Sequence, residues 1–314
     1  MAVYTQVSAE EMAALLARYD LGTLVSAKGI AEGVENSNYL LDTSERRLLL
    51  TLYEKRVDRA DLPFFFALLD HLADRGVPVP RTFRDRDGQQ LQMVAGRPAC
   101  LIEFLPGISV SHPSAAQAHS VGRALGQMHA ALTDFPLTRP NALGLAGWQA
   151  LAGRCGSDGL DAIAPGLAAR VADELAWLEK HWPADLPQAV VHGDLFPDNV
   201  LMRGDAVGGL IDFYFAATEV RGWDLAVTHA AWSFSADGAS HDAAVGDALI
   251  AGYDSVFGRS AAECAAFAAL ARGACLRFLL TRAFDWVNTP PGALVVRKDP
   301  LAFLRRLDHY AAQR

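Results

Sequence analysis

The sequence predicts an α+β protein whose first third is rich in β-strands and whose remainder is mainly helical. Short apolar and β-branched runs separated by turn residues fill the first third, where residues 62–74 add one stretch of helical spacing. Beyond Pro106 the chain is rich in alanine and carries apolar residues at helical intervals. Because 314 residues exceed what one core usually spans, we expect an N-terminal lobe at 1–105 and a C-terminal lobe at 106–314.

Composition and charge narrow the class of protein. Hydrophobic residues make up 51% and charged residues 20%, as in an ordered globular chain. The net charge of −8 disfavours nucleic acid and anionic membranes as partners. The N-terminus shows no targeting pattern and we see no membrane-spanning stretch, so we expect a cytoplasmic protein. The sequence does not determine its oligomeric state. The four cysteines form no C-x-x-C pair and are expected to be buried thiols.

Local signals place the elements of the first lobe. Ser8 and Glu11 have capping-box spacing, which predicts a helix from there to about Tyr19. Pro63 suits the first turn of the helix at 62–74, and Gly76 suits its C-terminal end. Four strands are predicted around these helices, at 23–27, 38–42, 48–53 and 99–105.

The second lobe is predicted to be helical around one small β-rich island. The helices are expected at 114–132, 165–182, 224–233, 242–257, 260–287 and 300–312. The island has strands at 189–191, 200–203 and 208–211, with Gly204-Asp205 as a hairpin turn.

Within this island lies the run V-V-H-G-D-L-F-P-D-N-V-L, which places His192, Asp194 and Asn199 as H-x-D-x-x-x-x-N. Asp212 follows Asp194 by eighteen residues, at the end of a strand. Phosphoryl transfer requires a divalent metal on the phosphates, and Mg²⁺ prefers oxygen ligands such as those of Asn199 and Asp212. It also requires a carboxylate that orients the acceptor hydroxyl and takes its proton, a role that suits Asp194. We therefore expect Mg²⁺ as the metal and a kinase reaction.

The alternative is that these residues form a polar turn and a strand cap, which any one of them alone would favour. The whole pattern of strand, loop, hairpin and second acid is more specific than any one of these residues, and it favours the kinase interpretation. His192 is expected to orient the loop, because its imidazole, two positions before the acid, points elsewhere.

These residues resemble the aminoglycoside phosphotransferase and choline kinase group, the small-molecule branch of the protein-kinase-like superfamily. The catalytic loop of that group reads H-G-D, and its metal-binding acid lies in an I-D-F/W context, here Ile211-Asp212-Phe213. The resemblance implies a protein-kinase-like fold with ATP as co-substrate, Asp194 as the catalytic base and Asn199 with Asp212 as Mg²⁺ ligands. It also implies that Asp224, in R-G-W-D-L, braces the catalytic loop.

The same resemblance implies where the nucleotide binds. The segment 28–38, with Lys28, Gly29 and Gly33, corresponds to the phosphate-covering loop, where small residues let backbone N–H groups approach phosphates. The stretch containing Glu103 and Leu105 falls where the family presents backbone groups to adenine.

One departure concerns the strand that normally carries a basic residue for the phosphates, because Thr51 stands there instead. Asp70 of the embedded helix thereby loses its usual partner. We therefore expect Lys28, Lys55, backbone donors and the metal to hold the phosphates.

A closer resemblance spans essentially the whole chain. The runs G-I-A-E-G-V-E-N-S-N-Y, L-T-L-Y-E, L-P-F-F, L-R-F-L-L-T-R-A-F-D and R-K-D-P resemble the bacterial homoserine kinases built on this fold. The activity implied is transfer of the ATP γ-phosphate to the side-chain hydroxyl of L-homoserine, which gives O-phosphohomoserine for threonine synthesis. In that family Thr51 is a normal trait.

Homoserine is a zwitterion, so its carboxylate needs a cation, and Arg277 or Arg282 on the late helix can supply it. An ordinary solvated helix face is the competing interpretation of these arginines. Two other functions stay open: a kinase for another hydroxyl compound, such as an aminoglycoside, choline, ethanolamine or methylthioribose, and a nucleotide-binding pseudokinase that regulates a partner.

Overall fold

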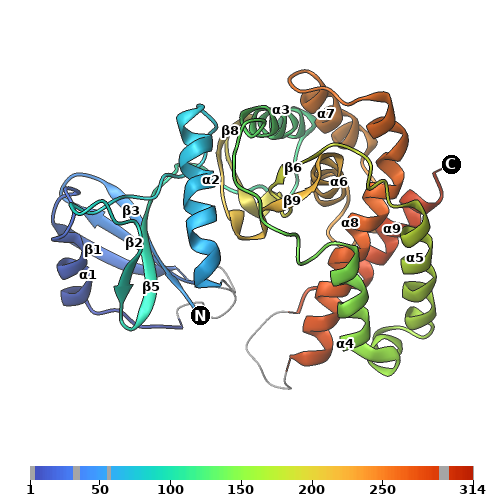
Figure 1. The fold of residues 1–314 in the computed structure, drawn as a ribbon, viewed down its shortest axis with the longest axis horizontal. Coiled ribbons are helices and arrows are strands. Elements are labelled where there is room, and N and C mark those ends of the chain that lie inside the picture. Colours follow the sequence, from blue (N-terminus) through green and yellow to red (C-terminus); the bar gives the residue numbers. More distant parts are fainter. Residues whose placement is uncertain (1–3, 31–35, 55–57, 290–296, 314) are drawn as a thin grey trace. The chain divides into compact units, whose positions relative to one another are not determined.

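The computed structural model describes residues 4–30, 36–54, 58–289 and 297–313. They form two compact units, the first comprising Met1–Gly107 with Gly208–Tyr214 and the second Ile108–Val207 with Phe215–Arg314. The first unit is built on a five-stranded sheet, and the second is mainly helical (Figure 1). The predicted α+β class, with a β-rich beginning and a helical remainder, is confirmed.

The sheet of the first unit has the order β1-β2-β3-β5-β4, and every pair of neighbours is antiparallel. Its strands are β1 (Leu24–Ile30), β2 (Asn36–Thr43), β3 (Arg47–Tyr53), β4 (Gln92–Val94) and β5 (Arg97–Glu103). The predicted strands are present, but β1 is longer than expected. Lys28 and Gly29 therefore lie in a strand and pair with β2, which corrects their predicted place in a loop. Gly33 lies outside the described residues.

Two helices cover opposite faces of this sheet (Figure 1). Helix α1 (Ala9–Leu16) begins with the predicted capping box, and α2 (Leu62–Asp74) has the predicted bounds. Because side chains alternate along a strand, β3 sends Leu48, Leu50 and Leu52 into the core beneath α1, and the residues between them face α2. The core on the α1 side includes Met12, Leu15, Leu16, Leu41, Leu48, Leu50, Leu52 and Leu101. Tyr53 lies on the opposite face, where its ring centroid is 6.5 Å from that of Phe66.

The helices of the second unit are α3 (Ala115–Ala131), α4 (Leu145–Ile163), α5 (Leu167–His181), α6 (Arg221–Trp232), α7 (Ala243–Asp254), α8 (Ala261–Asn288) and α9 (Leu301–Ala311). Helices α4, α5, α6 and α9 pack against the long helix α8. We expected no stretch able to cross a bilayer, yet α8 is long and apolar enough by length and composition. Because 56% of its most apolar stretch is buried, α8 has the character of a core helix in a soluble protein.

Helix α4 and strand β9 of the second unit were not predicted. Helix α4 contains a kink at Gly156, whose φ of +69° is outside the helical range. Strand β9 (Ala217–Val220) pairs antiparallel with β6 (Gln188–Val191). The predicted hairpin is present as β7 (Val200–Arg203) and β8 (Ala206–Leu210).

The four cysteines are all free, but only three are buried. Cys264 is exposed near the start of α8, which corrects the expectation that every cysteine is buried. The thiols of Cys100, Cys155 and Cys275 have raised pKa values because of burial.

Candidate active site

The predicted catalytic loop follows β6 directly and begins with His192, whose side chain is fully buried. Nδ1 of His192 accepts a hydrogen bond of 3.2 Å from the amide of Asp194. Gly193 between them has a φ of +74°, and a Cβ there would lie 3.1 Å from the carbonyl oxygen of Phe215. A residue with a side chain would therefore be strained at this position. The result is a tight turn that presents the partly exposed carboxylate of Asp194.

Asp224 in the first turn of α6 holds this turn through its backbone. Its two carboxylate oxygens accept hydrogen bonds from the amides of His192, at 2.7 Å, and Gly193, at 2.8 Å. Burial would raise the pKa of Asp224, but the hydrogen bond from His129, the nearby His192 and the Gly193 amide outweigh it, so the pKa is lowered. Sequence reasoning did not select His129, whose only signal was a histidine among the apolar residues of its helix.

Arg277 reaches the same turn from α8. Its side chain is 2% exposed, and Nη1 donates a hydrogen bond to the carbonyl oxygen of Gly193. Nη2 lies 3.9 Å from Oδ1 of Asp194. The guanidinium carbon lies 5.0 Å from the ring centroid of Phe215 and 4.3 Å from that of Phe278. A buried cation in this position orients the loop and adds positive charge beside the Asp194 carboxylate.

Asn199 ends a short 3₁₀ turn, Pro197–Asn199, immediately before β7. Its Nδ2 donates to the carbonyl oxygen of Asp194 at 2.7 Å and to Oδ2 of the Asp194 side chain at 3.1 Å. Because the NH₂ group is used inside the loop, the amide oxygen Oδ1 is turned away from it. This oxygen is of the type that Mg²⁺ prefers as a ligand.

Asp212 belongs to the first unit and follows β8. It is exposed and has a φ of +67°, a conformation uncommon for residues other than glycine. The chain is anchored on both sides: the Leu210 amide donates to the carbonyl oxygen of Pro78 at 2.7 Å, and the Tyr214 ring packs edge-on against Tyr53. Strained conformations held in this way are concentrated at functional sites.

Thr51 on β3 is buried and donates its hydroxyl hydrogen to Oδ1 of Asn38, at 2.7 Å. Asp70 on α2 pairs with Arg84, whose Nη2 lies 2.8 Å from Oδ2, and accepts a further bond of 3.1 Å from Gln90. The missing strand lysine therefore does not leave Asp70 without a partner. Sequence reasoning did not find Arg84, which lies far from Asp70 along the chain and outside any motif.

The other nucleotide-binding candidates lie apart on the first unit. Lys28 and Gly29 are exposed on β1. Glu103 ends β5, and its amide donates to the carbonyl oxygen of Arg81 at 2.8 Å. Leu105 packs over Gly209, and we find no hydrogen bond of its amide within the described residues. The other two candidates, Gly33 and Lys55, fall outside the described part of the chain.

Arg282 is the second predicted arginine on α8 and is partly buried. Its Nη1 donates to the carbonyl oxygen of Asp299 at 3.0 Å, and its guanidinium carbon lies 4.5 Å from the ring centroid of Phe303. Burial and the nearby Arg306 lower the pKa of Arg282 to about 10, although Asp299, Asp198 and Asp194 oppose that shift. Arg282 therefore remains a cation at neutral pH and lies within electrostatic range of the Asp194 carboxylate.

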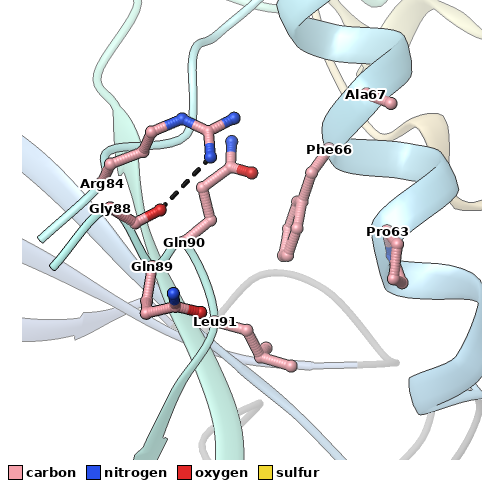
Figure 2. A pocket seen from close by; sticks show the side chains of 8 residues that line it. All are labelled: Pro63, Phe66, Ala67, Arg84, Gly88, Gln89, Gln90 and Leu91. Carbon is pink, nitrogen blue, oxygen red and sulfur yellow. Dashed lines mark hydrogen bonds between the residues drawn. The ribbon is translucent and has the colours of Figure 1, made fainter.

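A small cavity of about 270 Å³ lies in the first unit, between α2 and the segment 84–91. Figure 2 shows the Phe66 ring on one side and the Arg84 side chain on the other, with Nη1 of Arg84 donating to the carbonyl oxygen of Gly88 at 3.3 Å. None of the predicted site residues within the described part of the chain lines this cavity. The residues that do are Pro63, Phe66, Ala67, Arg84, Gly88, Gln89, Gln90 and Leu91.

The model of the APH family, described as a phosphotransferase enzyme family, matches residues 26–262. The chain belongs to this family, which agrees with an acid-bearing loop after a strand in a β-rich and helical fold. Its relatives include the homoserine kinase of Zymomonas mobilis, which is 54% identical over 99% of this chain and 97% of that protein. The homoserine kinase of Azorhizobium caulinodans is 53% identical, with the same shares covered.

Solved structures agree on the fold. A structure of amicoumacin kinase hAmiN has a TM-score of 0.70 and 14% identity, covering 96% of each chain. Choline kinase from Cryptosporidium parvum has a TM-score of 0.68 and 16% identity, covering 97% of this chain and 94% of that one. The predicted protein-kinase-like fold of the aminoglycoside phosphotransferase and choline kinase type is therefore confirmed.

Proposed function

We propose that this chain is a homoserine kinase that transfers the γ-phosphate of ATP to the side-chain hydroxyl of L-homoserine. The observation that carries this proposal is identity of 54% and 53% to homoserine kinases over nearly the whole chain. The product, O-phospho-L-homoserine, is an intermediate of threonine biosynthesis. The presence of Asp194, Asn199 and Asp212 argues against a pseudokinase.

In the proposed reaction Asp194 orients the homoserine hydroxyl and accepts its proton as the oxygen attacks phosphorus. The loop geometry supports this role, because Asn199 and Arg277 approach the carboxylate and Asp224 fixes the backbone that carries it. Arg277 itself is better suited to holding the loop than to binding substrate, since it is buried and bonded to Gly193.

We assign Mg²⁺ to Asn199 and Asp212, which would hold it through an amide oxygen and a carboxylate. The residues fit such an ion: the Asn199 amide turns its NH₂ group inward, and the Asp212 side chain is exposed on a fixed backbone. When bound, the ion would offset the negative charge of the ATP phosphates. The first unit would supply the nucleotide contacts, with Lys28, Gly29, Gly33, Glu103, Leu105 and Lys55 as candidates.

We assign the homoserine carboxylate to Arg282. The guanidinium has five N–H donors, and within the described residues only one hydrogen bond, to the carbonyl of Asp299, is formed. A two-pronged contact with a carboxylate is therefore available. The second unit would then hold the acceptor substrate. We further propose that the protein acts in the cytoplasm.

The direct test is an ADP-release assay with Mg²⁺, ATP and a panel of acceptors: L-homoserine, choline, ethanolamine, an aminoglycoside and methylthioribose. We expect kcat/KM for homoserine to exceed that for every other acceptor by orders of magnitude. A higher kcat/KM for another acceptor would replace homoserine with that compound. Absence of turnover with the whole panel, together with intact ATP binding, would favour a nucleotide-binding regulator.

A further inference from the structure

We propose that Tyr253, on α7, is a positioning residue for phosphoryl transfer and acts on the catalytic loop through His129 and Asp224. The Tyr253 hydroxyl lies 2.8 Å from Nδ1 of His129, and Nε2 of the same ring lies 3.1 Å from Oδ2 of Asp224. The three side chains are at most 1% exposed. This chain of hydrogen bonds continues into the backbone amides of His192 and Gly193.

The direction of each proton in this chain follows from the available partners. Burial raises the pKa of Tyr253, so its hydroxyl keeps its hydrogen, and within the described residues His129 is its only hydrogen-bond partner. Tyr253 therefore donates to Nδ1, which must be the unprotonated nitrogen of a neutral ring. Nε2–H then donates to the Asp224 carboxylate. A doubly protonated ring would leave the Tyr253 hydroxyl hydrogen buried without an acceptor, which is unfavourable.

Close packing of two helices brings Tyr253 to His129. Helices α3 and α7 lie side by side, and glycines form the contact (Figure 1). A Cβ on Gly122 of α3 would clash with the carbonyl of Leu249, and a Cβ on Gly252 of α7 would clash with the carbonyl of His119. The ring centroids of His129 and Tyr253 are consequently 5.6 Å apart, in an edge-on arrangement. The contact between the two side chains is thus fixed by the backbones of both helices.

The consequence for the reaction concerns Asp224, which accepts three hydrogen bonds. Oδ2 takes the His129 ring and the His192 amide, and Oδ1 takes the Gly193 amide. If the His129 ring is free to rotate or to take up a second proton, Asp224 loses one fixed donor, and the turn that carries Asp194 is held less rigidly. Misplacement of a catalytic group lowers the rate of the chemical step.

The test compares Tyr253→Phe with Tyr310→Phe. Tyr310 on α9 is a matched control, because its hydroxyl is also buried against a histidine, His229 of α6, but among the residues that the structure describes this pair makes no hydrogen bond to the loop. Well below the melting temperature, we expect Tyr253→Phe to lower kcat by roughly 3- to 10-fold while KM for homoserine and for ATP stays within about twofold. Tyr310→Phe should lower only the melting temperature.

A second measurement does not depend on whether Tyr253→Phe folds. Long-range ¹H–¹⁵N correlation spectra of the imidazoles, with the His129 signal identified by its loss in His129→Gln, should show a neutral Nε2–H tautomer in the unmodified protein. An Nδ1–H tautomer or a doubly protonated ring at neutral pH would overturn the inference. So would an unchanged kcat in Tyr253→Phe, or an equal fall of kcat in Tyr310→Phe. The inference rests on the proposed phosphoryl transfer, but inactivity of the unmodified protein would count against that function and leave the tautomer measurement intact.

Discussion

At the scale of single residues, the catalytic loop is held through its backbone. Asp224 accepts hydrogen bonds from the amides of His192 and Gly193, while Arg277 of α8 donates to the Gly193 carbonyl. The loop therefore owes its shape to groups distant in sequence. The side chain of Asp194 is left partly exposed.

Asp194→Asn should abolish most turnover and leave the fold intact. The amide cannot take the hydroxyl proton, so we expect kcat to fall by about 10²- to 10⁴-fold. The Asn199 contact can persist through the new side-chain oxygen. Steady-state kinetics measures the effect, and an unchanged dissociation constant for Mg²⁺-ATP serves as the control. Retention of near-normal kcat would remove Asp194 from the mechanism.

Asn199→Ala and Asp212→Ala should each weaken the Mg²⁺ dependence of ATP binding, because each removes one oxygen ligand. The measurement is a titration of ATP binding at several Mg²⁺ concentrations, with Asp198→Ala as a matched control. The Asp198 side chain is exposed, and its Oδ2 lies 3.7 Å from Nζ of Lys298. Equal Mg²⁺ dependence in all three variants would count against the metal assignment.

Arg282→Ala should raise KM for homoserine, since the substrate carboxylate would lose a charge-assisted partner. A loss of about 2 kcal/mol corresponds to roughly 30-fold in kcat/KM. Arg305→Ala is the control, because Arg305 is an exposed arginine whose Nη1 lies 3.4 Å from Oδ2 of Asp299. Wild-type kinetics in the Arg282 variant would make Lys298 the next candidate for the contact with the substrate carboxylate.

The sequence predicts the acids of the candidate site because their spacing is a local pattern. It could not identify Arg84 as the partner of Asp70, because such a pair depends on how the chain folds back. The same holds for His129 beside Asp224. Arg277 is predicted as a substrate ligand from its place on the late helix, whereas its burial and its hydrogen bond to the Gly193 carbonyl favour a role in holding the loop.

At the scale of elements, helices with clear caps were predicted within a few residues. Helix α8 begins after Ser260, which forms a capping box with Glu263, and α3 begins with the same device at Ser114. Helix α4 was missed, since its glycines weaken the helical signal. Strand β9 was missed because it is only four residues long and its polar residues hide the alternation.

The kink in α4 allows a matched pair of substitutions. A Cβ on Gly153 or on Gly156 would meet no atom within 4 Å, so backbone conformation alone decides the outcome. Gly156 has a φ of +69° and a ψ of 159°, a conformation essentially restricted to glycine, and Gly156→Ala should lower the free energy of unfolding by about 1 to 3 kcal/mol. Gly153 is helical, and Gly153→Ala should raise the free energy of unfolding by about 0.5 to 1 kcal/mol. Urea titrations measure both, and effects of equal sign would refute the argument.

At the scale of the whole molecule, the division of the chain is discontinuous. Composition placed one boundary near residue 105, but the segment Gly208–Tyr214 belongs to the first unit. Tyr214 explains this, because its ring packs edge-on against Tyr53 and Phe65 with centroids 5.6 Å apart in both pairs. The sequence pattern does not predict that residues 208–214 pack with the first unit, because this packing depends on contacts between residues far apart in the sequence.

The stability of the molecule should fall as the pH falls because of His229, which is 5% exposed. Burial lowers its pKa from 6.5 to about 3, and His241, His309 and Arg259 add to the effect by repulsion. The unfolded chain then binds a proton at a higher pH than the folded chain does. Stability from this group is therefore complete above about pH 6.5 and is lost progressively toward pH 3, at about 1.4 kcal/mol per pH unit.

At pH 5 the loss attributable to His229 should be about 2 kcal/mol relative to pH 7. His229→Gln keeps an acceptor for the Tyr310 hydroxyl but cannot take up the proton, so its free energy of unfolding should change less between these pH values. Urea titrations at pH 7 and pH 5 compare the variant with the unmodified protein. Equal pH dependence in both would show that the buried His229 side chain does not couple proton binding to unfolding.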